Sequence, residues 1–504
     1  MKKKFDIFAG LLRFASVAGL LFGSAFCAEA ERLDSIRWKA ELSADFSHGD
    51  FNPFWFSANR QGLSSVTPNN GYVSLGAFKD MKESERLSWG AGVELAGAWN
   101  FTSPFVVQQL YGEVKYRCLD LLVGSKNMEG PISDPYLSTG NLVHSGNARP
   151  IPQVRAGIFD YADVWGLNGW IGVKGYLAYG AFTDGSWQQH WEEPAGRYNK
   201  GTLYCGRGLW IRNGNENKFP LVFEAGIEMV TEFGGSCYNL GYPGSGITVH
   251  MPKNFKAFVK ALIPHGGDQT TIASEQQNVQ GNMLGAWNFR LSWTPQGKEW
   301  GVRAYYQHLF EDHSMLYIDY PWKDGLYGVE GILPRNPWVS KIVYEFMSLK
   351  DQSGSVNWTV TPEVPGHAAG ADDYYNHNLY VGWEHWGMGI GTPMCLSPIY
   401  NRPHNLAFHS NRIRTHHVGL SGDPLPSLSW RLLLTYTRSW GGYNHIFPKV
   451  MDVFNGLAEV SYKPQGGKLK GWVGTVGIGW DGGNLIGRNV GVELKISRSG
   501  FFGF

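Results

Sequence analysis

The chain has 504 residues, a formal net charge of +1 and a slightly polar mean hydropathy of −0.25. A near-neutral chain lacks the basic surface that nucleic-acid binding requires, so no nucleic-acid partner is expected. Glycine is abundant, with 66 residues, and 21 tryptophans contribute to an aromatic content of 14%. A polar average with so many aromatic residues favours a membrane β-barrel over a soluble β-protein, because barrel strands alternate lipid-facing and lumen-facing side chains.

Residues 1–30 form a predicted secretory signal peptide. Lysines at positions 2–4 precede an apolar run over residues 7–26, and Ala28-Glu29-Ala30 provides a small-x-small cleavage site. Beyond residue 30 the chain has no uninterrupted apolar run of about 18 residues, so no membrane-spanning helix is predicted. The mature chain, residues 31–504, is therefore either a soluble periplasmic protein or a β-barrel with extracellular loops, and the composition favours the barrel.

Alternation of apolar and polar residues recurs along the mature chain. Trp89, Val93 and Leu95 share one face of an extended segment, whereas Glu94 lies on the other. This pattern indicates a half-exposed strand, and aromatic residues at both of its ends match the interfacial girdles of membrane barrels. The other predicted strands are 38–46, 110–116, 119–125, 170–179, 221–231, 287–293, 300–306, 342–346, 379–383, 428–436, 472–480 and 490–496.

The number and spacing of these segments predict the fold class. Roughly 9–11 residues per tilted strand, plus turns, allow about 16–18 strands. The predicted fold is all-β, a single large antiparallel transmembrane β-barrel with one non-strand insert. Phe502 and the terminal Phe504 share a face of the last predicted strand, which is the signal that the barrel assembly machinery reads. That machinery and outer-membrane lipid are therefore expected partners.

The non-strand insert spans Leu137–Ile158. Pro150 and Pro152 lack backbone donors, so this stretch is neither a central strand nor a continuous helix. Gly140 and Ser145 supply the conformational freedom and side-chain caps of turns. The sequence predicts a shaped polar insert, and an ordinary surface loop explains the same residues equally well.

Two aromatic-rich segments are candidate sugar-binding sites. Trp187, His190 and Trp191 follow an Asp-Gly turn, and Tyr374 and Tyr375 begin another segment. Aromatic faces carry the apolar side of a sugar ring, and neighbouring polar groups bind its hydroxyls. The alternative is an interfacial aromatic belt, which is the more common use of Trp and Tyr in barrels.

No residue set predicts catalysis or a cofactor. His144 and Ser145 are adjacent, but adjacent side chains on an extended chain point apart, and the sequence has no Gly-x-Ser-x-Gly elbow. A solvated acidic loop explains the remaining polar cluster better than a metal site does. That cluster comprises His308, Glu311, Asp312, His313 and Asp324.

Four cysteines follow the signal peptide, at positions 118, 205, 237 and 395. The periplasm permits disulfides, but these spacings select none of the three possible pairings. Cys205–Cys237 is the preferred pair, because a barrel hairpin would bring the two residues near each other.

Several segments together resemble the capsule-assembly Wzi family of Gram-negative outer membranes. The signature is Leu137-Ser-Thr-Gly140 followed by Asn147-Ala-Arg149-Pro150-Ile-Pro152. Further matching segments are 55–62, 179–184, 281–287, 307–312, 324–328, 344–346, 352–354, 389–393 and 411–412. The resemblance implies a barrel of about 18 strands with a small helical element, and a lectin-like, non-catalytic role in attaching or organising capsular polysaccharide. It carries over Asn147, Arg149, Pro150 and Pro152 as structural landmarks.

The leading hypothesis is an outer-membrane protein that binds, anchors or organises capsular or extracellular polysaccharide at the cell surface. The candidate ligand-binding residues are Asn147, Arg149, Trp187, His190, Trp191, Tyr374 and Tyr375. A porin-like channel for small polar solutes is the alternative, with Glu224, Glu228 and Arg290 lining the pore. An insert that folds inward would weaken the channel hypothesis. An outer-membrane lipid hydrolase is the third hypothesis.

Overall fold

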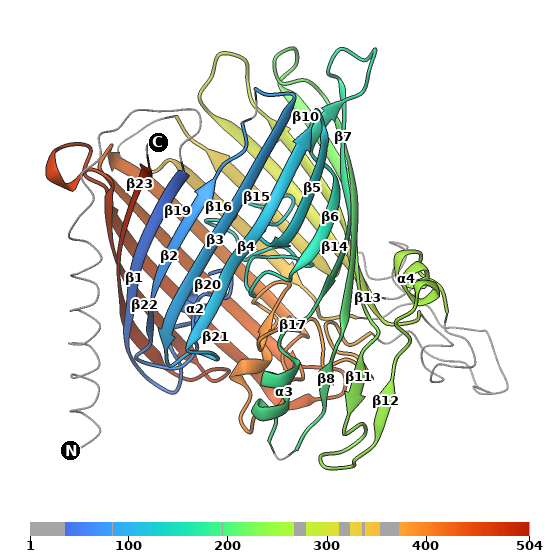
Figure 1. The fold of residues 1–504 in the computed structure, drawn as a ribbon. Coiled ribbons are helices and arrows are strands. Elements are labelled where there is room, and N and C mark those ends of the chain that lie inside the picture. The colour runs from blue at the N-terminus through green and yellow to red at the C-terminus, as the bar shows by residue number, and fades with distance from the viewer. Residues whose placement is uncertain are drawn as a thin grey trace.

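The structure is a computed structural model that describes residues 36–82, 84–193, 195–266, 279–311, 323–334, 338–352 and 372–502. Within them, eighteen antiparallel strands form one sheet, which closes on itself where β1 pairs with β23 (Figure 1). The closed sheet confirms the predicted all-β barrel, at the upper end of the predicted strand number. The predicted signal peptide and Phe504 lie outside the described residues.

The barrel strands follow one another around the wall in chain order. They are β1 (Ile36–His48), β2 (Gly71–Lys79), β3 (Leu87–Trp99), β4 (Phe105–Tyr116), β5 (Leu119–Ser125), β6 (Gln153–Asp163), β7 (Ile171–Ala181), β9 (Leu203–Asn213), β10 (Leu221–Phe233), β13 (Asn282–Trp293), β14 (Gly301–Glu311), β15 (Gly325–Ile332), β16 (Lys341–Ser348), β19 (Ile413–Leu425), β20 (Leu428–Gly441), β21 (Ile446–Tyr462), β22 (Trp472–Gly483) and β23 (Asn489–Phe502).

Five short strands and a few small helices lie outside this wall. The strands are β8 (Tyr198–Lys200), β11 (Ser236–Tyr238) and β12 (Thr248–His250), which form a small sheet, and the hairpin of β17 (Glu384–His385) and β18 (Met388–Gly389). The helices are α2 (Phe54–Ser57), α3 (Gly185–Trp191), α4 (Phe255–Leu262), η1 (Pro398–Tyr400) and η2 (Gly467–Leu469). Among the described residues, no helix is long and apolar enough to cross a bilayer.

The two ends of the barrel differ in the length of their connections. At the end that we call the short-turn end, tight turns such as 117–118 and 426–427 join the strands, and Ile36 pairs with Phe502. The opposite, long-loop end carries the extended connections, and Figure 1 shows α3, β8, β11 and β12 gathered there. This asymmetry is typical of outer-membrane barrels, whose short turns face the periplasm.

The wall exposes apolar side chains outward and buries polar ones. On β4, Leu110 and Val114 are 58% and 43% exposed, whereas Tyr111 and Glu113 on the opposite face are buried. Carboxylates inside and leucines outside reverse the pattern of a soluble protein. The outer face is therefore suited to lipid, and the inner face to a polar or filled lumen.

Three long connections turn back into this lumen. We call them the first insert (residues 49–70, with α2), the second insert (126–152) and the third insert (349–412, with β17, β18 and η1; described over 349–352 and 372–412). Each contacts the wall through hydrogen bonds. Trp55 Nε1 donates to Thr435 Oγ1 on β20 at 3.2 Å, and the Leu142 and Tyr375 backbone N–H groups both donate to β14 side chains.

The hydrophobic core consequently lies inside the barrel. Trp55, Leu142 and Trp383, one from each insert, are no more than 2% exposed. They belong to one apolar cluster that also contains lumen-facing wall residues such as Leu309 and Leu433. The inserts thus fill the space that a porin leaves to water.

Two sequence predictions require correction. The predicted strand at 379–383 is wrong, because this segment lies in the third insert, where Trp383 Nε1 donates to Val143 O at 2.8 Å. The predicted disulfide between Cys205 and Cys237 is also wrong. Cys118, Cys205, Cys237 and Cys395 are all free thiols in the structure. Cys205 instead packs beside α4, against Ala257 and Ala261.

Candidate functional site

The signature residues of the second insert join the three inserts to one another. Asn147 is fully buried, its Oδ1 accepts from the Asn59 N–H of the first insert at 3.0 Å, and its Nδ2 donates to Gly389 O of the third at 2.8 Å. Ser145 Oγ donates to Gly391 O at 2.6 Å. Gly140 has a φ of +95°, a left-handed conformation that disfavours any side chain there. These residues are structural connectors.

Proline and leucine positions of the signature complete this framework. Pro150 O accepts a hydrogen bond from Ser125 Oγ at 2.9 Å, and Pro152 O accepts one from the Ala181 N–H at 3.2 Å. Leu137 is fully buried, and its carbonyl accepts from His417 Nε2 on β19 at 2.7 Å. The stretch from residue 153 onward, which the sequence assigned to the insert, belongs to β6.

A wall carboxylate anchors the middle of the second insert. Glu345 on β16 is 1% exposed and accepts from Ser138 Oγ at 2.6 Å, from Thr139 N–H at 2.7 Å and from Thr139 Oγ1 at 2.6 Å. Tyr305 OH on β14 donates to the same carboxylate at 2.5 Å. Buried charge is stable only when its hydrogen bonds are satisfied, and here the insert satisfies them.

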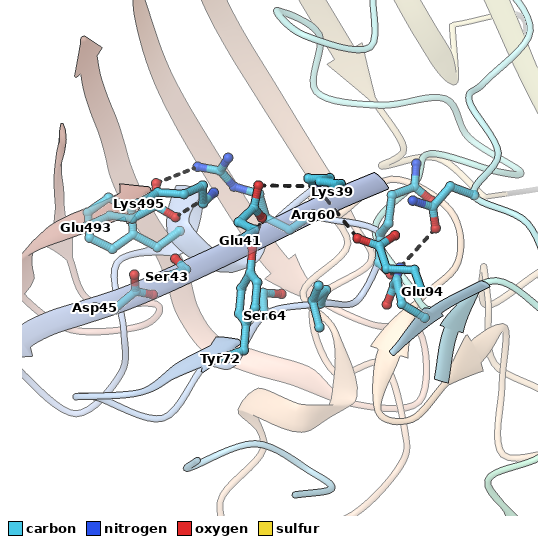
Figure 2. A pocket seen from close by; sticks show the side chains of 15 residues that line it. Lys39, Glu41, Ser43, Asp45, Arg60, Ser64, Tyr72, Glu94, Glu493 and Lys495 are labelled. Carbon is cyan, nitrogen blue, oxygen red and sulfur yellow. Dashed lines mark hydrogen bonds and ion pairs between the residues drawn. The ribbon is translucent and has the colours of Figure 1, made fainter. Parts of the chain in front are cut away.

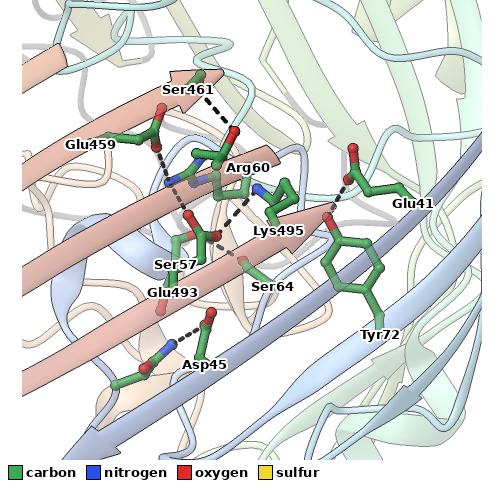
Figure 3. A network of polar contacts seen from close by, with 12 residues as sticks. Glu41, Asp45, Ser57, Arg60, Ser64, Tyr72, Glu459, Ser461, Glu493 and Lys495 are labelled. Atoms are coloured by element: carbon green, nitrogen blue, oxygen red, sulfur yellow. Dashed lines mark hydrogen bonds and ion pairs between the residues drawn. The ribbon is translucent and has the colours of Figure 1, made fainter. Parts of the chain in front are cut away.

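An arginine of the first insert anchors that insert to wall carboxylates on β21 and β23 (Figure 3). Arg60 Nη2 lies 3.4 Å from Glu459 Oε2 on β21 and 3.4 Å from Glu493 Oε2 on β23. Arg431 also pairs with Glu459 at 2.8 Å, and Lys495 pairs with Glu493 at 3.2 Å. The cations thus balance two buried wall carboxylates that would otherwise face each other across the strands.

A charged cavity of about 230 Å³ remains between the first insert and the wall (Figure 2). Most of its charges are mutually paired: Lys39 lies 3.2 Å from Glu41 and 3.7 Å from Glu94, and Tyr72 OH donates to Glu41 at 2.6 Å. Because strands β1, β2, β3 and β23 supply most of the lining, the cavity lies inside the barrel wall.

The charges predicted to line a pore are occupied by the second insert. Arg290 is ion-paired with Glu224, and its Nη1 donates to Ile132 O at 3.2 Å. Glu228 accepts from Tyr176 OH at 2.6 Å and lies 3.2 Å from His144 Nδ1. These side chains do face inward, but they hold the insert in place.

The long-loop end carries a second, larger polar cavity of about 370 Å³. The third insert, the tips of β13 and β14 and the 442–445 turn surround it. Its polar lining residues are Arg197, Asn282, Glu311, Asp372, Asp373, Asn376, His377, Asn378, His409, Asn444 and His445. Carboxylates, amides and neutral imidazoles are the groups that bind sugar hydroxyls.

Two imidazoles of this cavity, those of His377 and His409, are held neutral. Burial, together with the Arg197 charge, lowers the pKa of His377 to about 3. Its Nδ1 accepts the Leu379 and Tyr380 N–H groups at 3.1 and 3.3 Å, so the ring fixes the local turn. Burial likewise lowers the pKa of His409 to about 4, with the neighbouring His445 contributing.

The long-loop end also carries a row of neighbouring side chains, which we call the aromatic–arginine ladder: Arg149, Trp386, Trp187, Trp191 and His404. The Arg149 guanidinium lies 4.6 Å from the Trp386 ring, and Trp386 lies 6.0 Å from Trp187. Trp187 stacks on Trp191 at 5.3 Å, and Trp191 stacks on His404 at 3.8 Å. The rings of Trp187, Trp191 and His404 cover one another's faces, so a ligand meets their edges and the polar groups beside them.

The structure places the predicted binding residues in two different environments. Trp187 and Trp191 on α3 belong to the ladder, and His190 beside them is exposed. Tyr374 and Tyr375 are fully buried, where Tyr375 OH donates to Leu142 O, so they are not available to a ligand. Burial removes these two tyrosines from the candidate set.

Sequence analysis missed Trp386, His404 and most of the cavity residues of the third insert. Trp386 occupies a two-residue hairpin turn between β17 and β18 with a φ of +58°, followed by Gly387 at +78°. Left-handed conformation is rare for so bulky a residue. The local signal was the Trp-Gly pair after His385, which is compatible with a tight turn.

The residues considered for catalysis and metal binding have structural partners. Ser145 Oγ donates to main-chain carbonyls, whereas His144 contacts Glu228 and Tyr204, so the two do not form a nucleophile–base pair. His308 Nδ1 lies 3.0 Å from Asp324 O. Among the described residues, no cluster of three or more potential ligands has the geometry of a metal site, and Asp312 and His313 lie outside them.

No family model matches the chain, and no curated protein matches it. Among solved structures it is similar to Wzi of Escherichia coli, an outer-membrane protein involved in group 1 capsule assembly and described as a carbohydrate-binding β-barrel. The match has a TM-score of 0.53 at 15% identity and covers 92% of this chain and 84% of that chain. In fold, the chain resembles the Wzi barrel.

OccAB2 of Acinetobacter baumannii and OccK3 of Pseudomonas aeruginosa are also similar, with TM-scores of 0.48 and 0.45 and identities of 10% and 12%. The matches cover 93% of this chain in both cases, 98% of the OccAB2 chain and 96% of the OccK3 chain. The match to Wzi confirms the expected resemblance for the fold, and the chain is a β-barrel that resembles Gram-negative outer-membrane proteins.

Proposed function

We propose that the protein is an outer-membrane barrel that binds and retains capsular or extracellular polysaccharide at the cell surface, without catalysis. Its apolar outer face suits lipid, and its short-turn end suits the periplasm, which directs the long-loop end outward. The signal peptide predicted for residues 1–30 accords with export. The Wzi barrel, whose fold this chain resembles, is itself described as carbohydrate-binding.

The observation that carries the proposal is the polar cavity at the long-loop end. Its carboxylates and amides match the hydrogen-bonding groups of sugars, and its volume of about 370 Å³ admits part of a chain rather than a whole polymer. The third insert, which supplies most of its lining, is braced by the other two inserts. A rigid, outward-facing polar surface is what a scaffold for a polymer requires.

A deletion strain tests this function. Loss of the gene is expected to leave polymer synthesis intact while polymer moves from the cell surface into the medium. Surface polymer and released polymer are measured separately, and complementation with the full-length gene serves as the control. Normal surface retention in the deletion strain would refute the proposal.

A channel for small polar solutes is the second candidate, supported by the charged cavity inside the wall. The three inserts argue against it, because they occupy the lumen, and the second insert engages Glu228 and the Arg290 that pairs with Glu224. Uptake of small polar solutes into proteoliposomes distinguishes the two functions. The scaffold function predicts uptake no faster than that of protein-free vesicles.

A further inference from the structure

Arg149 is a buried cation without a counter-ion. Only 8% of its surface is exposed, and its Nη2 donates to Thr102 Oγ1 at 2.8 Å. Within the part of the chain that the structure describes, no carboxylate lies within ion-pair distance of this guanidinium. Burial accordingly lowers the pKa of Arg149 to about 10, with Asp184 only partly opposing the shift. A guanidinium in such a position favours an anionic partner.

The free side of this guanidinium is not fully enclosed. Neither Nε nor Nη1 of Arg149 is among the fully enclosed nitrogens that lack a partner, so both retain contact with solvent. The plane of the group rests on the Trp386 ring at 4.6 Å, which fixes its orientation. Trp386 in turn is held by the hairpin turn and by its N–H bond to Asp184 Oδ2 at 2.8 Å. The arginine is therefore positioned before any ligand arrives.

A second unpaired arginine lies at the other end of the ladder. Arg402 is exposed, its Nη1 donates to the Ile399 and Asn401 carbonyls at 3.1 and 2.8 Å, and its guanidinium lies 5.9 Å from the Trp191 ring. It has no ion pair with any described residue. The adjacent Glu192 is buried, and burial raises its pKa to about 7, which reduces the negative charge beside the ladder.

From this arrangement we infer that the aromatic–arginine ladder is a binding site for the carboxylate groups of an acidic polysaccharide, with Arg149 and Arg402 each receiving a uronate sugar of the same chain. The inference rests on the proposed function and names its ligand class. Guanidinium pairs with carboxylate through two parallel hydrogen bonds, which a neutral hydroxymethyl group cannot replace. The polar cavity at the long-loop end binds hydroxyl groups of the same polysaccharide. The carboxylate contacts therefore add to the affinity that the hydroxyl contacts supply.

The test compares two oligosaccharides that differ in this group. Purified full-length protein in detergent is titrated with oligomannuronate and with mannose oligomers of the same length and linkage. The wild-type protein is expected to bind the oligomannuronate at least tenfold more tightly at low salt. The difference shrinks at high salt, because exposed charge pairs are screened.

Three variants locate the effect. Arg149→Gln and Arg402→Gln are each expected to lose about tenfold in oligomannuronate affinity while mannose oligomers bind unchanged. Arg402 is exposed, so its variant tests the inference even if Arg149→Gln folds poorly. Arg212→Gln, at the short-turn end, is the matched control and is expected to change neither affinity.

Each outcome decides the inference. Equal affinity of the wild-type protein for both oligomers overturns it and leaves the proposed function standing. Preferential binding of oligomannuronate that persists in both Arg149→Gln and Arg402→Gln also overturns it, because residues outside the ladder would then bind the carboxylates. Absence of binding to either oligomer overturns it as well, and the deletion strain then tests the proposed function separately. Preference for lipid A micelles over oligomannuronate would assign the ladder to phosphate and contradict the carboxylate site.

Discussion

The barrel wall and the three inserts are built on opposite principles. The wall depends on neighbouring strands: every strand pairs with the next in sequence, and its exposed leucines meet the surroundings. The inserts have little regular backbone pairing, and side chains from distant parts of the sequence satisfy their polar groups, as Asn147 does for Asn59 and Gly389. Local rules therefore specify the wall, whereas the filled lumen depends on long-range polar contacts. Breaking one such contact should affect the inserts more than a comparable change in the wall.

The largest effect is expected from Arg60→Ala. Removing this cation leaves Glu459 and Glu493, which are 6% and 3% exposed, without one of their partners inside the barrel. We expect a loss of about 4 kcal/mol in unfolding free energy, measured by urea titration in lipid vesicles. The first insert should also become accessible to protease while the wall stays folded.

Arg212→Ala provides the control for this change. Arg212 pairs with Asp163 at 2.7 Å, but both side chains are substantially exposed, so the expected loss is less than about 1 kcal/mol. Equal losses in the two variants would mean that the buried network does not fix the insert.

The next largest effect is expected from a comparison of two leucine truncations, one inside the barrel and one on its outer face. Leu142→Ala removes a fully buried side chain from the insert core, with an expected loss of about 3 kcal/mol. Leu121→Ala truncates a wall residue that is 45% exposed, and about 1 kcal/mol is expected. Both values come from the same titration. A larger loss at Leu121 would place the stabilising core outside the lumen.

A smaller, local effect is expected from acid. His377 has a pKa lowered to about 3 by burial, against about 6.5 in an unfolded chain. The unfolded state therefore binds more protons between these values, and the stability that the neutral ring contributes is full above pH 6.5 and is lost as pH falls toward 3. Amide exchange at Leu379 and Tyr380, corrected for intrinsic rates, should be faster at pH 5 than at pH 7.5. In His377→Asn this pH dependence should disappear.

The last prediction concerns the orientation of the barrel in the membrane, and no loss of stability is expected in it. Cys118 is exposed in the turn between β4 and β5 at the short-turn end, whereas Cys205, Cys237 and Cys395 are buried. A bulky, membrane-impermeant maleimide should leave intact cells unlabelled and should label Cys118 after the outer membrane is permeabilised. A Cys118→Ser strain supplies the background. Labelling of intact cells would show that the short-turn end faces outward.

The same contrast explains which features were predictable from the sequence. Alternation at Trp89–Trp99 marks a wall strand, because one face of that strand is polar and the other meets the outer surface. Residues 379–383 resemble a strand only because the insert buries them on all sides, so their apolar run carries no directional information. The prolines correctly indicated a non-strand segment, but its inward path depends on Glu345, more than two hundred residues further along the chain.

The candidate site was predictable only in part, for a related reason. Trp187, Trp191 and Arg149 were predicted as binding residues, but their association depends on Trp386 and His404 from the third insert. Tyr374 and Tyr375 are residue types that occur in surface sugar sites, yet tertiary packing encloses both side chains completely. Composition identifies residues able to bind sugar, whereas only the folded inserts decide which of them reach the surface.

The central claim is that the inserts close the lumen and make the barrel a scaffold. The most direct test is the electrical conductance of the purified protein in planar lipid bilayers. The account predicts no stable conductance steps for the wild-type protein and the appearance of steps in Arg60→Ala, in which the first insert is released. Steady ion conduction by the wild-type barrel would contradict it.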